Sequence, residues 1–460
     1  MESSGVQKPG FFLHLGARSL WFRRFCRLVL LLCFFAGVGC RGPEDLEQNL
    51  AIQRFRTYLR IPTVHPDPDY QPAIEFLLAQ AKEIGLSTRT IEFVSKKPIL
   101  LMTWKGSSEE KLQSVILNSH IDVVPVEEEK WKYPPFEAQM DEDGNIFARG
   151  SQDMKVVGMM YLEALRLLKD RGWSPVRDIH VLWVPDEEVG SDDGWGRLYT
   201  SKEFDELNAG IVLDEGDDSL FNNSYFVNYG EKAMWWLVIQ ATDGTGHGSL
   251  YFDNSASENL FKSIASINAF RDSQMALVRS GEKTLQEVVV VNFVFLNSGS
   301  RTPDGYTMNI QPSMAEAGFD VRIPPTREMA DFVNKRIVEE WAPKARNMSF
   351  YFTCKTETKD GDVPISKADD SNPWWYLLRM AASKLNATLI PRLQVGGTDS
   401  SFARLRGIDA FGITAIQNVP PLYHDHNEFM NGYEFLKGIN MMVETIDLYG
   451  SFSDSLNQES

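Results

Sequence analysis

Cysteine is scarce in this sequence. The chain of 460 residues has four cysteines, and three of them lie within the first 40 residues. The fourth, Cys354, has no second cysteine in the body of the chain, so an intrachain disulfide framework is excluded there. A CxxC zinc site is excluded for the same reason. Any bound metal must therefore be held by His, Asp and Glu side chains.

Positive charge is also in deficit. The chain has 46 Lys and Arg residues against 63 Asp and Glu residues, which gives a formal net charge of −17. Such a body repels nucleic acid and anionic membrane surfaces, so we expect no nucleic-acid partner. The hydrophobic fraction of 43% is ordinary for a globular protein, and the length favours two domains.

The N-terminal segment, residues 1–40, carries a short apolar run. "FRRFCR" precedes 13 residues, "LVLLLCFFAGVGC", which end in small residues. A basic flank and a short apolar core are typical of a secretory signal, and a bilayer span needs about 20 residues. We therefore expect a secreted or extracellular protein. An uncleaved membrane anchor and an extension of a cytoplasmic protein are the alternatives. N-glycosylation sequons, which support export only weakly, lie at Asn222, Asn347 and Asn386.

Strands and helices alternate through residues 44–228. Apolar periodicity and breakers predict helices at 44–60, 72–84 and 154–172, and strands at 114–120, 144–150, 178–185 and 209–216. This alternation is typical of an α/β layer, a mostly parallel sheet flanked by helices. The same character returns over residues 357–450. We expect these two stretches to form one discontinuous domain.

Residues 229–356 differ in character. Longer β-rich runs occupy 231–242, 287–300 and 315–325, with a helical stretch at 257–273. We predict an α+β domain inserted into the α/β domain. "MWW", at 234–236, is interpreted as core of this insertion.

Polar residues gather where the predicted strands end, which in open α/β sheets is the edge that forms the ligand crevice. They are His120, Asp122, Asp153, Glu187, Glu188, Asp214, Glu215, His424 and His426. His and carboxylate ligands without Cys are typical of catalytic zinc. The spacing in "HID" places His120 and Asp122 on the same face of an extended segment. The Asp122 carboxylate can therefore accept a hydrogen bond from the second ring nitrogen of His120. Three carboxylates and two neutral imidazoles around two Zn²⁺ leave a charge of +1, which one bridging hydroxide cancels.

The stretch "PDEEVG", residues 185–190, ends a predicted strand on two adjacent glutamates. Side chains alternate along an extended chain, so we expect Glu187 and Glu188 to face different ways and to have different tasks. Spacing alone does not say which is the base.

Each feature also has a structural interpretation. Taken alone, "HID" contains a structural histidine, Asp153 is a helix N-cap, and "DEE" and "DEGDD" are solvated acidic turns. "HDHNE" is then a polar loop. The convergence of all of them in one α/β layer favours a metal site.

Six motifs in order resemble one known family. They are "NSHIDVVPV", "WKYPPFEAQMDEDGNIFARGSQDMK", "VPDEEVGSDDGWG", "LDEG", "TGHGS" and "YHDHNE". The chain resembles, over about Leu46 to Leu448, the co-catalytic zinc metallopeptidases and amidohydrolases, which include glutamate carboxypeptidase, dipeptidases and aminoacylases. "ARGSQDMK", "LDEG" and "DDSNPWW" are most similar to the type-one aminoacylases.

The resemblance implies two Zn²⁺ per subunit and a role for each site residue. Asp153 would bridge the zinc ions. Glu187 would be the catalytic base, and Asp122 would contact a metal-binding residue and orient it. The inserted domain would be a lid and dimerisation domain, from which His247 enters the partner subunit's site and stabilises the oxyanion. Terminal ligands would be His120, Glu188, Glu215 and His424, and lid residues that contact the substrate end would be Asn309 and Arg322.

One position departs from the family pattern. In many members an arginine follows the glycine-rich turn and is expected to anchor the substrate carboxylate. Here "VGGTDSSFAR" has Ser401 at that position, and Arg404 three residues later is the alternative anchor.

The resemblance implies hydrolysis of N-acyl-L-amino acids to a carboxylate and a free L-amino acid, by a homodimer. Within the family, the alternatives are a dipeptidase and a hydrolase or synthase of long-chain fatty-acyl amino acids. Outside it, they are a secreted binding or scaffold protein that keeps the fold without catalysis, and an acidic globular protein without metal.

Overall fold

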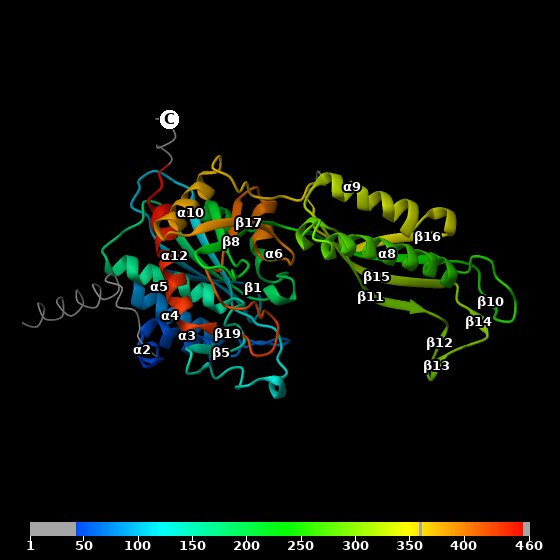
Figure 1. Cartoon of the computed structure of the whole chain (residues 1–460), viewed down its shortest axis with the longest axis horizontal. Helices are drawn as coiled ribbons and strands as arrows, with labels where there is room; N and C mark the ends of the chain where they lie inside the picture. Colours follow the sequence, from blue (N-terminus) through cyan, green and yellow to red (C-terminus); the bar gives the residue numbers. More distant parts are fainter. Residues whose placement is uncertain (1–42, 358–360, 454–460) are drawn as a thin grey trace, which may run out of the picture.

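The computed structural model describes residues 43–357 and 361–453 (Figure 1). The apolar run predicted as a signal lies outside these residues. Figure 1 shows an α/β body on one side and an elongated lobe, formed by the insertion, on the other. No helix of the described residues is both long enough and apolar enough to cross a membrane.

An eight-stranded mixed sheet forms the centre of the α/β body. Its strand order is β1-β2-β6-β3-β7-β18-β8-β17, and the central pairs β6/β3, β3/β7 and β7/β18 are parallel. The strands are β1 (Ser87–Val94), β2 (Lys97–Trp104), β3 (Ser114–His120), β6 (Ile179–Val184), β7 (Ala209–Asp214), β8 (Ser224–Glu231), β17 (Thr388–Gln394) and β18 (Asp409–Gly412). Every residue of the strands β3, β6 and β7 is buried because helices cover both faces of the sheet.

Two helical layers cover the sheet. The larger layer packs on the face that includes Trp183 and Leu213, and the smaller one packs on the face that includes Leu182 and Val212. The larger layer comprises α2 (Pro43–Gln48), α3 (Leu50–Leu59), α4 (Gln71–Ile84), α5 (Lys155–Asp170), α10 (Pro373–Lys384) and α12 (Gly432–Ser451). The smaller comprises α6 (Trp195–Leu198), α7 (Lys202–Leu207) and α11 (Ser400–Leu405). The mixed α/β fold predicted from the sequence is therefore confirmed.

The insertion has its own antiparallel sheet, in the order β11-β15-β9-β16, and its own apolar core. Its strands are β9 (Ala233–Thr242), β11 (Val290–Ser298), β15 (Met314–Ile323) and β16 (Met348–Lys355), and its helices are α8 (Ala256–Arg279) and α9 (Arg327–Arg336). Trp235 lies in this core, but Trp236 is 44% exposed, so the interpretation of "MWW" as core was wrong for Trp236. The strand geometry is the reason, because successive side chains of β9 point to opposite faces.

Smaller elements complete the fold. The helix predicted over 44–60 is two helices, because the Asn49 side chain accepts from Ala51 N–H and Ile52 N–H and so begins α3. Short strands are β4 (Gln139–Met140), β5 (Asn145–Phe147), β10 (Gly246–His247), β12 (Arg301–Thr302), β13 (Gly305–Tyr306), β14 (Ile310–Gln311) and β19 (Phe429–Asn431). Short helical turns are η1 (Glu128–Lys130), η2 (Glu187–Val189), η3 (Leu285–Glu287), η4 (Ile337–Trp341) and η5 (Lys344–Arg346).

Candidate metal centre

Three neighbouring parallel strands end at one edge of the large sheet. His120 is the last residue of β3, Glu187 and Glu188 lie in η2 just after β6, and Glu215 directly follows β7. Because β3 pairs in parallel with both β6 and β7, these side chains meet at the carboxyl ends of the strands.

Two groups of potential metal ligands share the carboxylate of Asp153. In the first, His120 Nε2 lies 3.0 Å from Asp153 Oδ1 and 3.8 Å from Glu215 Oε2. In the second, His424 Nε2 lies 3.2 Å from Asp153 Oδ2 and 2.9 Å from Glu188 Oε2. The ligand atoms within each group all lie within 4.8 Å of one another. The structure thus brings together the five residues that the resemblance named as ligands.

The imidazole of His120 is oriented for metal binding. Its Nδ1 lies 2.9 Å from the backbone carbonyl oxygen of Asp122, which only accepts, so Nδ1 carries the proton and donates. In the neutral ring Nε2 is then unprotonated, and its lone pair points at the carboxylates of Asp153 and Glu215. These three groups are electron-pair donors that face one another, and a cation bound between them would accept an electron pair from each.

The environment of Glu188 also fits a metal. Its side chain is 4% exposed, and its Oε1 is a buried oxygen without a hydrogen-bond partner among the described residues. Burial raises the pKa of Glu188, and the charge of Asp153 raises it further. Buried, unsatisfied carboxylates are unfavourable unless they are paired or coordinate a metal.

Asp153 does not cap α5. The residue at the N-cap position is Met154, without a side-chain capping bond, and the Asp153 carboxylate is turned toward the two histidines. The solvated-turn interpretation of "DEGDD" is also wrong for Asp214 and Asp218, which are 1% and 4% exposed.

The carboxylate of Asp122 has partners that the sequence did not predict. It was expected to accept from His120, but its Oδ1 is 3.6 Å from His120 Nδ1, farther than the backbone oxygen of the same residue. Asp122 instead accepts from the backbone N–H groups of Glu187 at 3.2 Å and Glu188 at 3.1 Å. It also pairs with His65 Nε2 at 2.9 Å. The carboxylate is turned away because η2 and His65 offer better-placed donors.

The two glutamates lie on a 3₁₀ turn rather than on an extended strand. Asp186, which precedes them, has a left-handed backbone with φ of 64°, so the strand ends before the pair. The alternation argument therefore does not apply, although the two side chains do have different surroundings. Burial raises the pKa of Glu187 well above its usual range, with the charge of Glu215 adding to the shift.

The loop that carries Asp153 is held by Glu428, the last residue of "YHDHNE". Glu428 is fully buried, and it accepts from Arg149 Nη1 and from Gln152 N–H, each at 2.6 Å. It also accepts from the backbone N–H of Asp153 at 3.3 Å. Because His424 lies in the same motif, Glu428 joins the loops that carry two of the ligands.

A second buried carboxylate pair lies beside the centre. Asn118 donates to Asp214 at 2.9 Å and to Asp399 at 3.2 Å, and Ser191 donates to Asp399 at 2.6 Å. Burial raises the pKa of Asp399 to about 8, with Asp214 adding to the shift. Asp399 was not predicted; its place in the turn "VGGTDSS" was the available signal.

The three candidate residues of the insertion do not lie together. His247 is in β10 and Asn309 directly precedes β14; these two strands pair antiparallel in a small two-stranded sheet, which Figure 1 shows at the end of the insertion far from the α/β body. His247 is exposed, and its Nδ1 lies 2.7 Å from Ser249 Oγ. Arg322 is at the other end of the insertion, near the end of β15, where it pairs with Asp320 at 2.8 Å.

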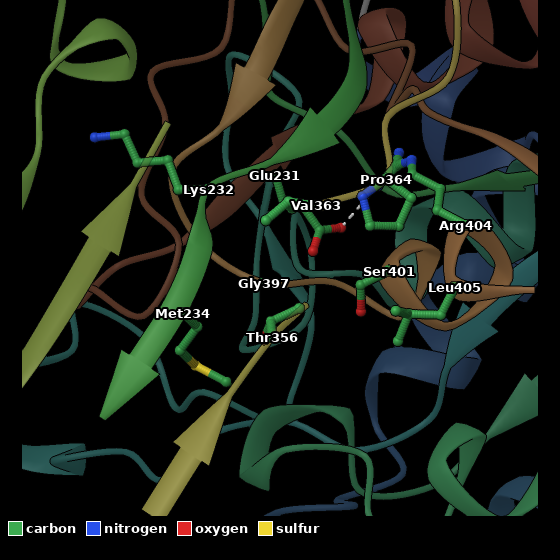
Figure 2. Close-up of a pocket in the computed structure, with 10 residues that line it drawn as sticks. All are labelled: Glu231, Lys232, Met234, Thr356, Val363, Pro364, Gly397, Ser401, Arg404 and Leu405. Atoms are coloured by element: carbon green, nitrogen blue, oxygen red, sulfur yellow. Dashed lines mark hydrogen bonds and ion pairs between the residues drawn. The ribbon is translucent and has the colours of Figure 1, made fainter. Parts of the chain in front are cut away.

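The alternative carboxylate anchor, Arg404, is already engaged. Figure 2 shows its ion pair with Glu231, 3.1 Å long, in a pocket that Ser401 also lines. Arg404 is 4% exposed and donates to the Ala410 carbonyl oxygen at 2.9 Å. Arg404 therefore ties the end of β8 to the helix that follows the glycine-rich turn, and its guanidinium does not replace the expected arginine.

Comparison with known proteins agrees with the fold. The sequence profile of the peptidase family M20/M25/M40 matches residues 116–448. Aminoacylase-1 of Dictyostelium discoideum is 38% identical over 88% of this chain and 98% of its own length, and human aminoacylase-1 is 35% identical over 89% and 97%. The Bacillus subtilis YXEP protein, a dinuclear metal-binding peptidase, superposes with a TM-score of 0.58 at 13% identity, over 86% of this chain and 96% of its own. The chain belongs to the peptidase family M20/M25/M40.

Proposed function

We propose that this protein is a zinc-dependent amidohydrolase that cleaves N-acyl-L-amino acids into a carboxylate and a free L-amino acid. Its relatives named aminoacylase-1 support this, because they match along almost their whole length. The observation that carries the proposal is the position of Glu187, a half-buried carboxylate close enough to His120, Glu188 and Glu215 for their charges to shift its pKa, beside two ligand groups that share Asp153.

We propose that the two ligand groups hold two Zn²⁺ ions. The ligand set of two imidazoles and three carboxylates without thiolate is the type that catalytic zinc takes. When bound, the metal pair would polarise the scissile carbonyl and acidify water. His120, Glu215, Glu188 and His424 would each serve one ion, and Asp153 would serve both.

Glu187 is proposed to move the proton. A carboxylate with a raised pKa accepts a proton from the attacking water and then gives it to the leaving nitrogen, which becomes the amine of the free amino acid. The backbone N–H of Glu187 is held by Asp122, so the turn that carries the base is fixed to the strand that carries His120. This bond fixes the backbone from which the side chain of the base extends.

We propose that the active unit is a homodimer built through the insertion. His247 lies in β10 and Asn309 directly precedes β14, and Figure 1 shows these two paired strands at the end of the insertion far from the α/β body. We therefore propose that this imidazole stabilises the oxyanion in the site of another subunit. Arg322, near the end of β15, is proposed to contact the substrate carboxylate: Asp320 engages its Nε and Nη2, and its Nη1 has no hydrogen-bond partner among the described residues. Arg404 is instead buried against Glu231.

We further propose that residues 1–40 direct the chain into the secretory pathway or anchor it to a membrane. The basic flank and short apolar run support this. N-terminal sequencing of the exported protein distinguishes cleavage from anchoring.

Metal content measured together with activity tests the proposed reaction. The purified protein is expected to contain two zinc ions per chain and to release methionine from acetyl-methionine. A chelator should abolish release, and added zinc should restore it. Cleavage of a dipeptide or of an oleoyl amino acid in place of acetyl-methionine would reassign the substrate within the family. Zinc without any hydrolysis would indicate a binding protein, and absence of zinc would overturn the metal assignment.

A further inference from the structure

His65 is a buried histidine outside the two ligand groups. It lies in the segment between α3 and α4, and its side chain is 8% exposed. Its Nε2 is 2.9 Å from Oδ2 of Asp122, whose side chain is fully buried. None of the motifs that predicted the site includes this residue.

Backbone pairing fixes the place of His65. Its N–H donates to the Val123 carbonyl oxygen at 3.1 Å, and Val123 N–H donates to the Thr63 carbonyl oxygen at 3.0 Å. Val64 and Val123 thereby form a parallel bridge next to the end of β3. The imidazole is thus held against Asp122 by main-chain bonds that do not depend on the metal site.

Asp122 connects the proposed metal ligand His120 to the turn η2, which carries the proposed base Glu187. Oδ1 accepts from Glu187 N–H, and Oδ2 accepts from Glu188 N–H. The final torsion of an aspartate side chain is broad, so two long backbone bonds of 3.1 and 3.2 Å orient it only loosely. The contact with His65 at 2.9 Å is the shortest of the three hydrogen bonds to this carboxylate, and the one that comes from a side chain.

We propose that His65 is a positioning residue: it donates from Nε2 to Asp122 and so fixes the carboxylate that holds the Glu187–Glu188 turn. The proposal rests on the proposed function for its kinetic consequence, but the contact itself does not. The hydrogen bond with Asp122 raises the pKa of His65 against the opposing effect of burial, with Asp186 as the other nearby acid, and this favours a donating ring.

Two substitutions separate hydrogen bonding from space filling. His65→Leu fills the site without a donor, whereas His65→Gln offers an amide N–H to Asp122. His180→Leu is the matched control, because His180 is a buried histidine of β6 whose Nδ1 lies 2.9 Å from Thr103 Oγ1, away from Asp122.

The measurements are kcat and KM for acetyl-methionine and the rate at which the zinc-loaded, full-length protein loses zinc to a chelator. His65→Leu is expected to lower kcat by about 10- to 100-fold and to speed zinc loss by a similar factor, with KM changed less than about twofold. His65→Gln should recover most of both losses. His180→Leu should change neither kcat nor zinc loss, although it destabilises the fold.

Two results would overturn the proposal. One is a His65→Leu protein with wild-type kcat and zinc loss; the other is a His65→Gln protein as impaired as His65→Leu, which would show that the ring only fills space. If the wild-type protein hydrolyses no N-acyl amino acid, the proposed function fails, and the rate of zinc loss still decides the role of His65.

Discussion

His424 Nε2 lies 2.9 Å from the carboxylate of Glu188, although the two residues belong to distant parts of the sequence. His424 is 55% exposed, whereas the Glu188 side chain is 4% exposed. The second ligand group is therefore closed on the protein side and open on the solvent side. An open side is what a catalytic metal site needs for substrate entry.

His424→Asn should remove metal from the second group. We expect zinc to fall from two ions per chain toward one, with kcat/KM for acetyl-methionine lowered at least about 100-fold. His426→Asn is the control, because His426 points to Glu127, 3.8 Å away, rather than to a ligand. Elemental analysis of both variants checks this, and full zinc in His424→Asn would contradict the ligand assignment.

Glu187→Gln should stop turnover without removing metal. The substitution keeps the size of the side chain and removes the proton acceptor, so we expect kcat to fall by about 10²- to 10⁴-fold. Zinc content and KM should stay close to wild type, because Glu187 belongs to neither ligand group. A kcat near that of wild type would show that another residue is the base.

The strand-end residues were predictable from the sequence because the physical rule behind them is local. Apolar runs end at His120 and Asp214, and parallel pairing brings such ends to one edge. The turn at Glu187 was not predictable in this way. Asp186 adopts a left-handed backbone, and the strand pattern does not contain that information.

Contacts between residues that are distant in the chain also could not be predicted from the sequence. His65 reaches Asp122 only because residues 63–65 pair with residues 121–123, and nothing in either segment alone indicates that pairing. Arg404 was considered as a substrate anchor because it is close to Ser401 in sequence. Its partner, Glu231, is the last residue of β8, far away in sequence, and only the fold reveals this contact.

A mixture of two inactive variants tests the site shared between subunits. If His247 acts in the partner's site, a heterodimer of Glu187→Gln and His247→Ala chains has one intact site and one doubly defective site. Random pairing makes half of the dimers mixed, so we expect about a quarter of wild-type activity from two inactive proteins. The activity of the co-expressed mixture, compared with each variant alone, checks this.

If instead His247 acts within its own chain, every site in the mixture carries one defect. The mixture would then be as inactive as its components, and the position of the β10/β14 sheet would need another explanation. Size-exclusion chromatography with light scattering is the control, because the result is informative only when both variants are dimers.

His180 should make the stability of the fold depend on pH below neutrality. Burial lowers its pKa to about 4, from an ordinary value near 6.5 in the unfolded chain. Between these values the unfolded state binds a proton and the folded state does not, so the free energy of unfolding falls as pH drops from 6.5 to 4. The full effect is on the order of 3 kcal/mol, reached at about pH 4. His180→Gln does not titrate, so its stability should fall less over this range. Urea unfolding of both proteins at pH 7 and pH 5, in chelator so that zinc release is common to both, measures the difference; an equal loss in the two would show that His180 is not the group responsible.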